Sequence, residues 1–307
     1  MRSKIIEAVS ATKKISGPGY RKNSKVVLHT MKGPRFIPMP KIKANGINIY
    51  YESHGRGDPL VLIMGLRRNA EWWYCQIPAL SEHFQVLVFD NRGAGRSDQP
   101  EEEYSISLFA DDTAALMKSL GLSSAHVLGI SMGGYIGQEL AIDYPEMVRR
   151  LILGCTGPGG SQAVLMSPER LTKFIANKGL SPEDILLKDM DIYFSEGFIQ
   201  ERPEKIKEFV EISMRYYQPP ESFLRQFAAC QKHDTFERLQ RIAQPTLIMT
   251  GDDDPLVPPG NSRILKEMIP QSRLEFFPAG RHCFFMEFAP LFNRQVIDFL
   301  KKETGGR

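Results

Sequence analysis

A serine between two glycines is the residue in this sequence best suited to covalent chemistry. Gly129, Ser131 and Gly133 form a Gly-x-Ser-x-Gly motif, preceded by an apolar run at 127–128 and followed by a helix-like segment at 135–142. Strand, tight turn and helix in this order predict a strained turn that exposes the serine hydroxyl as a nucleophile. A glycine-rich turn with a solvent-facing serine is the alternative, and the flanking elements favour the nucleophile. Side chains at the glycine positions would collide with neighbouring backbone.

The serine needs a base, and the base needs an acid that orients it. His282 follows a late predicted strand through a turn that contains a glycine, and Asp252, Asp253 and Asp254 follow the strand before it. Parallel strands deliver the loops at their carboxyl ends to one edge of a sheet. The order of these residues therefore predicts Ser131 as nucleophile, one of the three aspartates as acid, and His282 as base.

The segments that must position these residues alternate between apolar strands and helices. The expected strands lie at 47–51, 60–64, 85–89, 125–130, 151–153, 245–250 and 274–277, and the expected helices of the body lie at 106–120, 135–142, 259–268 and 290–302. Continuous apolar strands that alternate with helices predict an α/β fold with a mostly parallel sheet covered on both faces. His126 lies inside the strand of the serine and is expected to be structural.

Residues 161–241 interrupt this alternation and are helical in character. Their apolar residues include many aromatics, and we expect Phe209 and Tyr217 to share one helix face. We predict that this segment forms a cap over the open end of the sheet. An apolar acyl pocket would then lie between the cap and Ser131. The entry at 157–160 could act as a hinge or as a static turn.

Composition describes an ordinary globular protein of 307 residues, 42% hydrophobic and 24% charged. The length fits two domains, or one α/β domain with an insertion. No run of 18 apolar residues exists, so no membrane span is expected. The four cysteines lie far apart and form no Cys-x-x-Cys pair, which argues against a zinc site and a disulfide framework. We therefore expect no metal and a reduced, cytoplasmic location.

Positive charge is concentrated at the start of the chain. Residues 1–44 hold eleven Lys or Arg against Glu7 alone, so they carry +10 and the remainder of the net +3 chain carries −7. We expect residues 1–38 to be a flexible basic extension without specific nucleic-acid binding, and Met31 or Met39 could serve as alternative starts. A basic arm that anchors the body to a polyanion is the alternative.

Taken together, these motifs resemble the α/β-hydrolase superfamily over roughly residues 41–300. The matching stretches are Gly65-Leu66, the polar loop 90–98, the serine motif 129–134, Gly251-x-x-Asp254 and Gly280-x-His282. The resemblance is strongest to small-ester and methyl-ester esterases with a helical cap. It implies a core at 39–160 and 242–307 with the cap at 161–241.

The resemblance also assigns residues within the motifs. The acid of such proteins lies three residues after the glycine, which selects Asp254. It implies an oxyanion hole formed by the backbone N–H groups of Leu66 and Met132.

We further expect substrate contacts from Gly65, Phe209, Tyr217 and Phe284. Arg67, Arg68 and Arg281 are unusual beside such a site; they could favour an anionic substrate, but we expect them to point to solvent.

The favoured function is a cofactor-independent serine hydrolase that acts on a small-molecule carboxylic ester with an apolar acyl group. Lactonase, carbon–carbon hydrolase and cofactor-free perhydrolase activities would use the same residues and stay open. Haloalkane dehalogenases and epoxide hydrolases need a carboxylate where Ser131 stands, so both are disfavoured. A non-catalytic ligand receptor with the same fold is the alternative outside enzymes. The sequence does not determine the oligomeric state.

Overall fold

The computed structural model describes residues 40–302, so residues 1–39 and 303–307 lie outside the described part. The predicted basic extension 1–38 and the alternative starts Met31 and Met39 fall outside the described residues. Residues 41–302 lie in one compact unit.

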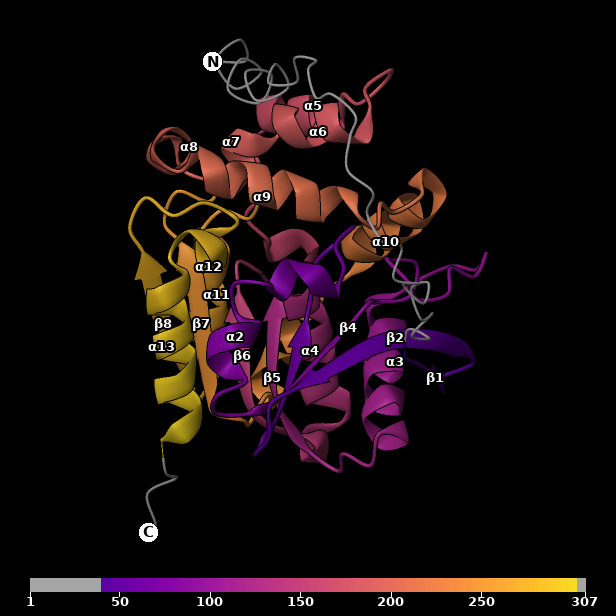
Figure 1. Cartoon of the computed structure of the whole chain (residues 1–307). Helices are drawn as coiled ribbons and strands as arrows, with labels where there is room; N and C mark the ends of the chain where they lie inside the picture. Colours follow the sequence, from indigo (N-terminus) through magenta and orange to yellow (C-terminus); the bar gives the residue numbers. More distant parts are fainter. Residues whose placement is uncertain (1–39, 303–307) are drawn as a thin grey trace, which may run out of the picture. The chain divides into compact units, whose positions relative to one another are not determined.

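A sheet of eight strands forms the centre of this unit, in the order β1-β2-β4-β3-β5-β6-β7-β8 (Figure 1). The strands β3 to β8 are mutually parallel, whereas β1 and β2 pair antiparallel at one edge. The strands are β1 (Lys41–Ala44), β2 (Ile47–His54), β3 (Pro59–Ile63), β4 (Gln85–Phe89), β5 (Ala125–Ile130), β6 (Val148–Gly154), β7 (Thr246–Gly251) and β8 (Ser272–Phe277). The mostly parallel α/β architecture expected from the sequence is confirmed.

Both faces of the sheet are buried. Alternate residues of each strand point to opposite faces, and each face packs into its own hydrophobic core. Leu60 and Leu62 of β3 belong to one core, and Val61 and Ile63 belong to the other. The first core is covered by α2 (Ile77–Leu80), α12 (Phe284–Glu287) and α13 (Ala289–Lys301), and the second by α3 (Ile106–Ser119), α4 (Met132–Asp143) and α11 (Gly260–Met268). Because helices cover both faces of the sheet, the parallel strands need apolar residues at nearly every position, which explains their continuous apolar sequences.

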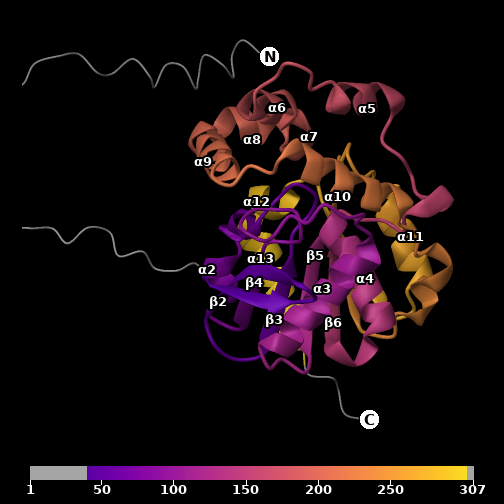
Figure 2. The same ribbon diagram turned by 90° about the vertical axis from the view of Figure 1, so that its right-hand side faces the viewer.

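The segment between β6 and β7, residues 155–245, is called the helical insertion here. Figures 1 and 2 show its helices α5 to α9 beyond one end of the sheet from two directions. Its elements are η4 (Gly160–Gln162), α5 (Pro168–Ile175), α6 (Pro182–Lys188), α7 (Met190–Tyr193), α8 (Glu196–Glu201), α9 (Pro203–Met214), α10 (Pro220–Lys232) and η5 (Phe236–Arg241). Serine caps begin α5, α6 and α8, where Ser167, Ser181 and Ser195 accept backbone N–H bonds.

The two ends of the helical insertion are bonded to each other. Gly159 and Asp234 form an antiparallel bridge, and the Thr235 N–H donates to the Pro158 carbonyl at 2.9 Å. The Gly160 N–H donates to the carbonyl of the residue before Asp234 at 2.8 Å. The entry at 157–160 is therefore a hydrogen-bonded turn in this structure.

His126 lies inside β5 and is 7% exposed, and its Nδ1 has no hydrogen-bond partner among the described residues. Burial, helped by the positive charge of Arg149, lowers the pKa of His126 to about 4. An unfolded chain protonates this ring near the ordinary histidine value of about 6.5. Below that pH the unfolded state binds more protons than the folded state, so stability falls as the pH drops towards 4.

We expect His126→Gln to remove this acid sensitivity. At pH 4.5 the wild-type chain should lose about 2–3 kcal/mol through His126 relative to pH 7, and the variant should not. Urea unfolding at both pH values measures the difference. His54→Gln is the control, because the His54 side chain is 35% exposed. Equal acid losses in wild type and the His126 variant would contradict this assignment.

No helix among residues 40–302 is long and apolar enough to cross a membrane.

Candidate active site

Ser131 occupies the turn between β5 and α4 in a backbone conformation that non-glycine residues rarely adopt. Its φ is 58° and its ψ is −121°. Such a conformation costs on the order of 1–3 kcal/mol and persists only where the surroundings impose it. Two hydrogen bonds help to do so: the Ser131 N–H donates to the Gly154 carbonyl at 2.9 Å, and the Thr156 hydroxyl donates to the Ser131 carbonyl at 2.9 Å.

The glycines of the motif are required by close backbone contacts. A Cβ atom at Gly129 would lie 2.0 Å from the Gly133 carbonyl oxygen, and one at Gly133 would lie 2.0 Å from the Ile63 carbonyl oxygen. Gly65, which follows β3, lies against the serine itself: a Cβ there would be 2.9 Å from the Ser131 Cβ and 3.4 Å from its Oγ. The loop after β3 therefore approaches the Ser131 side chain directly.

Asp254 and His282 form a buried hydrogen-bonded pair after β7 and β8. His282 Nδ1 lies 2.8 Å from Asp254 Oδ2, and the residues are 6% and 3% exposed. Asp254 Oδ1 accepts the N–H groups of Leu256 and Val257 at 2.8 and 3.0 Å. Because an ionised carboxylate only accepts hydrogen bonds, we assign the ring proton to Nδ1. His282 Nε2 then carries the lone pair that a base requires.

The neighbouring aspartates have other partners. Asp252 Oδ1 accepts the Ala279 N–H at 2.6 Å, and Asp253 lies 3.0 Å from the Arg281 Nε. Asp253 is 61% exposed at its side chain. Of the three aspartates that the sequence offered, Asp254 is thus the one in contact with His282.

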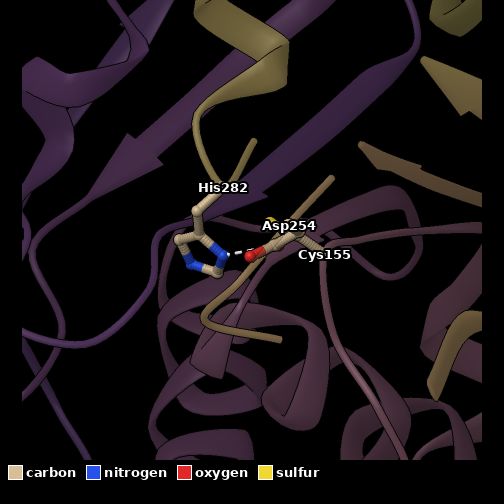
Figure 3. Close-up of side chains that lie close together, drawn as sticks. All are labelled: Cys155, Asp254 and His282. Atoms are coloured by element: carbon tan, nitrogen blue, oxygen red, sulfur yellow. Dashed lines mark hydrogen bonds and ion pairs between the residues drawn. The ribbon is translucent and has the colours of Figure 1, made fainter. Parts of the chain in front are cut away.

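Cys155 lies beside this pair, as Figure 3 shows. Its Sγ, an Asp254 carboxylate oxygen and a His282 ring nitrogen all lie within 4.8 Å of one another. Burial and the Asp254 charge raise the pKa of the thiol well above its ordinary value. The protonated thiol is a poor metal ligand, and the hydrogen bonds above account for both Asp254 oxygens without an ion. Sequence reasoning missed this neighbour, because Cys155 lies in no recognisable motif.

Cys155 is a neighbour of both Ser131 and the Asp254–His282 pair. This cysteine directly follows Gly154, the acceptor for the Ser131 N–H, and the Ser131 backbone contributes to the environment of the thiol. No hydrogen bond joins Ser131 to His282 among the described residues. Such bonds are often long in ligand-free sites and tighten when substrate binds.

Two backbone N–H groups at the site have no protein acceptor. Among residues 40–302, neither the Leu66 N–H nor the Met132 N–H donates a hydrogen bond to the protein. The loop that carries Leu66 is held by Asp90, whose Oδ1 accepts the Ala70 N–H at 2.7 Å, and by Asn91, whose Nδ2 donates to the Met64 carbonyl at 2.9 Å. The polar loop after β4 therefore positions the loop after β3.

The arginines of this region do not simply point to solvent, and our expectation for them was wrong. The Arg67 guanidinium lies 4.1 Å from the centroid of the Phe223 ring, and that of Arg68 lies 4.0 Å from the Trp72 ring. Arg281 pairs with Asp253. Cation–π contact with aromatic rings keeps Arg67 and Arg68 half-buried.

Two of the aromatic residues expected to contact substrate are core residues in this structure. Phe284 is fully buried against Phe277 and Phe292, and Phe209 is 1% exposed. Neither presents surface to a ligand, so both assignments need correction. Tyr217 is half-buried but lies beyond the end of α9 at Met214, so it does not share a helix face with Phe209.

Phe209 joins the helical insertion to the body of the protein. Its ring centroid lies 4.8 Å from that of Trp72, in η2 (Ala70–Trp73), and 4.9 Å from that of Phe194. We expect Phe209→Ala to lower the free energy of unfolding by about 3–5 kcal/mol, because it leaves a cavity among these rings. Urea unfolding measures it. Leu224→Ala is the control, since Leu224 is 60% exposed; similar losses in both variants would refute the role of Phe209.

Comparisons with known proteins identify the family of this chain. The model of the alpha/beta hydrolase fold family matches residues 58–289. RutD of Agrobacterium fabrum, whose assignment as a carbamate hydrolase is provisional, is 30% identical over 262 residues, covering 82% of this chain and 98% of RutD. The enol-lactonase of Burkholderia xenovorans superposes with a TM-score of 0.76 at 25% identity, covering 86% of this chain and 100% of the lactonase.

An esterase of Exiguobacterium antarcticum superposes with the same TM-score, 0.76, at 26% identity, and 85% of this chain and 99% of the esterase are covered. The family match spans both the Ser131 turn and the Asp254–His282 pair. The chain belongs to the alpha/beta hydrolase fold family.

Proposed function

We propose that this protein is a serine hydrolase that cleaves carboxylic esters through an acyl-enzyme, without a cofactor. The observation that carries the proposal is the strained Ser131 turn beside a buried Asp254–His282 pair. Strained backbone conformations persist only where the surrounding structure imposes them, and they cluster at functional sites. Here the strain would serve to expose a nucleophile at the end of the sheet. The membership of the chain in a family of hydrolases supports the same conclusion.

The residues would act in two half-reactions. His282 Nε2 takes the proton of the Ser131 hydroxyl while Oγ attacks the ester carbonyl carbon, and Asp254 stabilises the resulting imidazolium. The N–H groups of Leu66 and Met132 bind the oxyanion. Collapse of the tetrahedral intermediate expels the alcohol, which receives the proton from His282. A water molecule then attacks the acyl-enzyme by the same steps and releases the acid and Ser131.

Ester and lactone hydrolysis share this mechanism, because a lactone is a cyclic ester. An enol-lactonase and an esterase are both among the similar structures, which supports either substrate class for this chain. Carbamate cleavage, the reaction in the provisional assignment of RutD, is the second candidate. We propose the domain limits expected from the sequence, with the core at 39–160 and 242–307 and with residues 161–241 of the helical insertion acting as the cap.

A hydrolysis screen tests the function directly. Purified protein is offered aryl and methyl esters of graded acyl length, a small set of lactones, and an aryl carbamate. Turnover of esters or lactones supports the proposal. Turnover of the carbamate alone would replace it by the second candidate, and binding of esters without turnover would favour the non-catalytic receptor.

A further inference from the structure

Arginine side chains in this protein differ in how their charge is neutralised. Arg92 donates to both carboxylate oxygens of Asp112, at 2.8 and 2.6 Å, and Arg96 lies 2.8 Å from Asp90. Both arginines are buried, and in each case the cation is paired with a buried acid. This pairing is the usual way in which a protein accommodates a charge that is withdrawn from water.

Arg67 lacks such a partner. Among residues 40–302, no carboxylate lies within 4.0 Å of Arg67 or Arg68, whereas Arg68 at least donates to the Tyr193 hydroxyl at 2.8 Å. No side-chain hydrogen bond is formed by the Arg67 guanidinium within the described residues. Asp189, an acid whose charge reaches Arg67, bonds the Lys188 Nζ through Oδ1 at 2.6 Å, and its Oδ2 has no hydrogen-bond partner among the described residues; it forms no ion pair with Arg67. Arg67 is therefore a half-buried cation with unused donors.

The backbone of Arg67 is fixed in the loop that approaches Ser131. It directly follows Leu66 and lies two residues from Gly65, which contacts the Ser131 side chain. Its φ of 71° is in the left-handed region. Its N–H donates to Gln226 Oε1 of α10 at 3.1 Å, which ties the loop after β3 to the helical insertion.

Holding a half-buried cation without an acid partner costs free energy. Burial and the neighbouring Arg68 both lower the pKa of Arg67, which means that they disfavour its charged form. Arginine nonetheless stays protonated at neutral pH. The unpaired charge is accounted for if an anion occupies this position during function, since a guanidinium matches a carboxylate with two parallel hydrogen bonds.

We propose that Arg67 binds a second, non-reacting carboxylate of the substrate. The preferred substrate is then an ester or lactone that carries a free carboxylate, rather than one with a wholly apolar acyl group. This inference rests on the proposed hydrolase function and specifies its substrate class. Arg68, stacked on Trp72 and bonded to Tyr193, adds positive charge on the same loop.

Two substrates of similar length test the inference: mono-4-nitrophenyl adipate, which is anionic, and 4-nitrophenyl hexanoate, which is neutral. We expect Arg67→Gln to lower the ratio of kcat/KM for the anionic to the neutral ester by about 10–100-fold, mainly through KM for the anionic ester. Arg67→Lys should restore part of the ratio that Arg67→Gln loses, because lysine keeps the positive charge but cannot form two parallel hydrogen bonds to a carboxylate.

Arg281→Gln is the matched control. It removes a cation at the same edge of the sheet that already has an acid partner, so the ratio should stay at the wild-type value. An unchanged ratio in Arg67→Gln, with normal circular dichroism, would overturn the carboxylate site and leave the hydrolase function standing.

Binding of adipate by calorimetry gives a readout that does not depend on turnover. Wild type should bind adipate about 10-fold or more tightly than Arg67→Gln, and added salt should weaken the wild-type affinity. Equal affinities, or no binding to wild type, would refute the carboxylate site even if neither ester is hydrolysed. Failure of wild type to hydrolyse any ester, with Arg67-dependent adipate binding retained, would instead reject the proposed function alone.

Discussion

Ser131→Ala should abolish ester hydrolysis, with a loss in kcat of about 10⁴–10⁶-fold. The change removes only the Oγ atom, so the acyl-enzyme has no site on which to form. The variant should fold, although its new alanine would inherit the φ of 58° that the turn imposes. Rates with the best ester from the screen, together with circular dichroism, measure both expectations.

Labelling gives an independent check of the same residue. A fluorophosphonate should modify Ser131 in the wild-type protein and leave the alanine variant unmodified, as read by mass spectrometry of the digested chain. Ser213, which is 5% exposed, serves as the internal comparison because no base lies beside it in the hydrogen bonds of the described residues. Modification of a different serine, or an active alanine variant, would reject Ser131 as nucleophile.

Asp254→Asn should lower kcat by about 10³–10⁴-fold, an effect second only to loss of the nucleophile. The asparagine oxygen can still accept the N–H groups of Leu256 and Val257, so the loop should keep its shape. Its NH₂ group would then face His282 Nδ1 and donate to it. The ring proton would move to Nε2, and the base would lose the lone pair that accepts the serine proton.

Asp252→Asn and Asp253→Asn are matched controls from the same loop. The partners of these side chains are Ala279 and Arg281, and among the described residues neither is hydrogen-bonded to the His282 ring, so we expect each change to cost about 10-fold or less. Rates for the three variants should be compared at one pH and at saturating substrate. A larger loss in Asp253→Asn than in Asp254→Asn would show that the acid has been misassigned.

The sequence by itself determined the architecture and most of the proposed site. Local pattern was sufficient for the buried strands, because a strand covered on both faces needs apolar residues throughout; residues 85–89 were predicted as a strand and form β4. The serine motif could be recognised in the sequence because a Cβ atom at Gly129 or Gly133 would collide with neighbouring backbone, so only glycine fits at these positions. The selection of Asp254 among three aspartates depended on the family pattern rather than on local chemistry.

Only the tertiary structure decided which side chains face one another across the carboxyl edge of the sheet. Periodicity shows that Phe209 has apolar neighbours, but not whether those neighbours are core residues or a ligand, and here they are Trp72 and Phe194. The sequence also does not show which arginines form an ion pair with an acid. Arg92 and Arg67 are the same residue type in similar polar loops, yet only Arg92 meets an acid, because its partner comes from a helix that the fold places beside it.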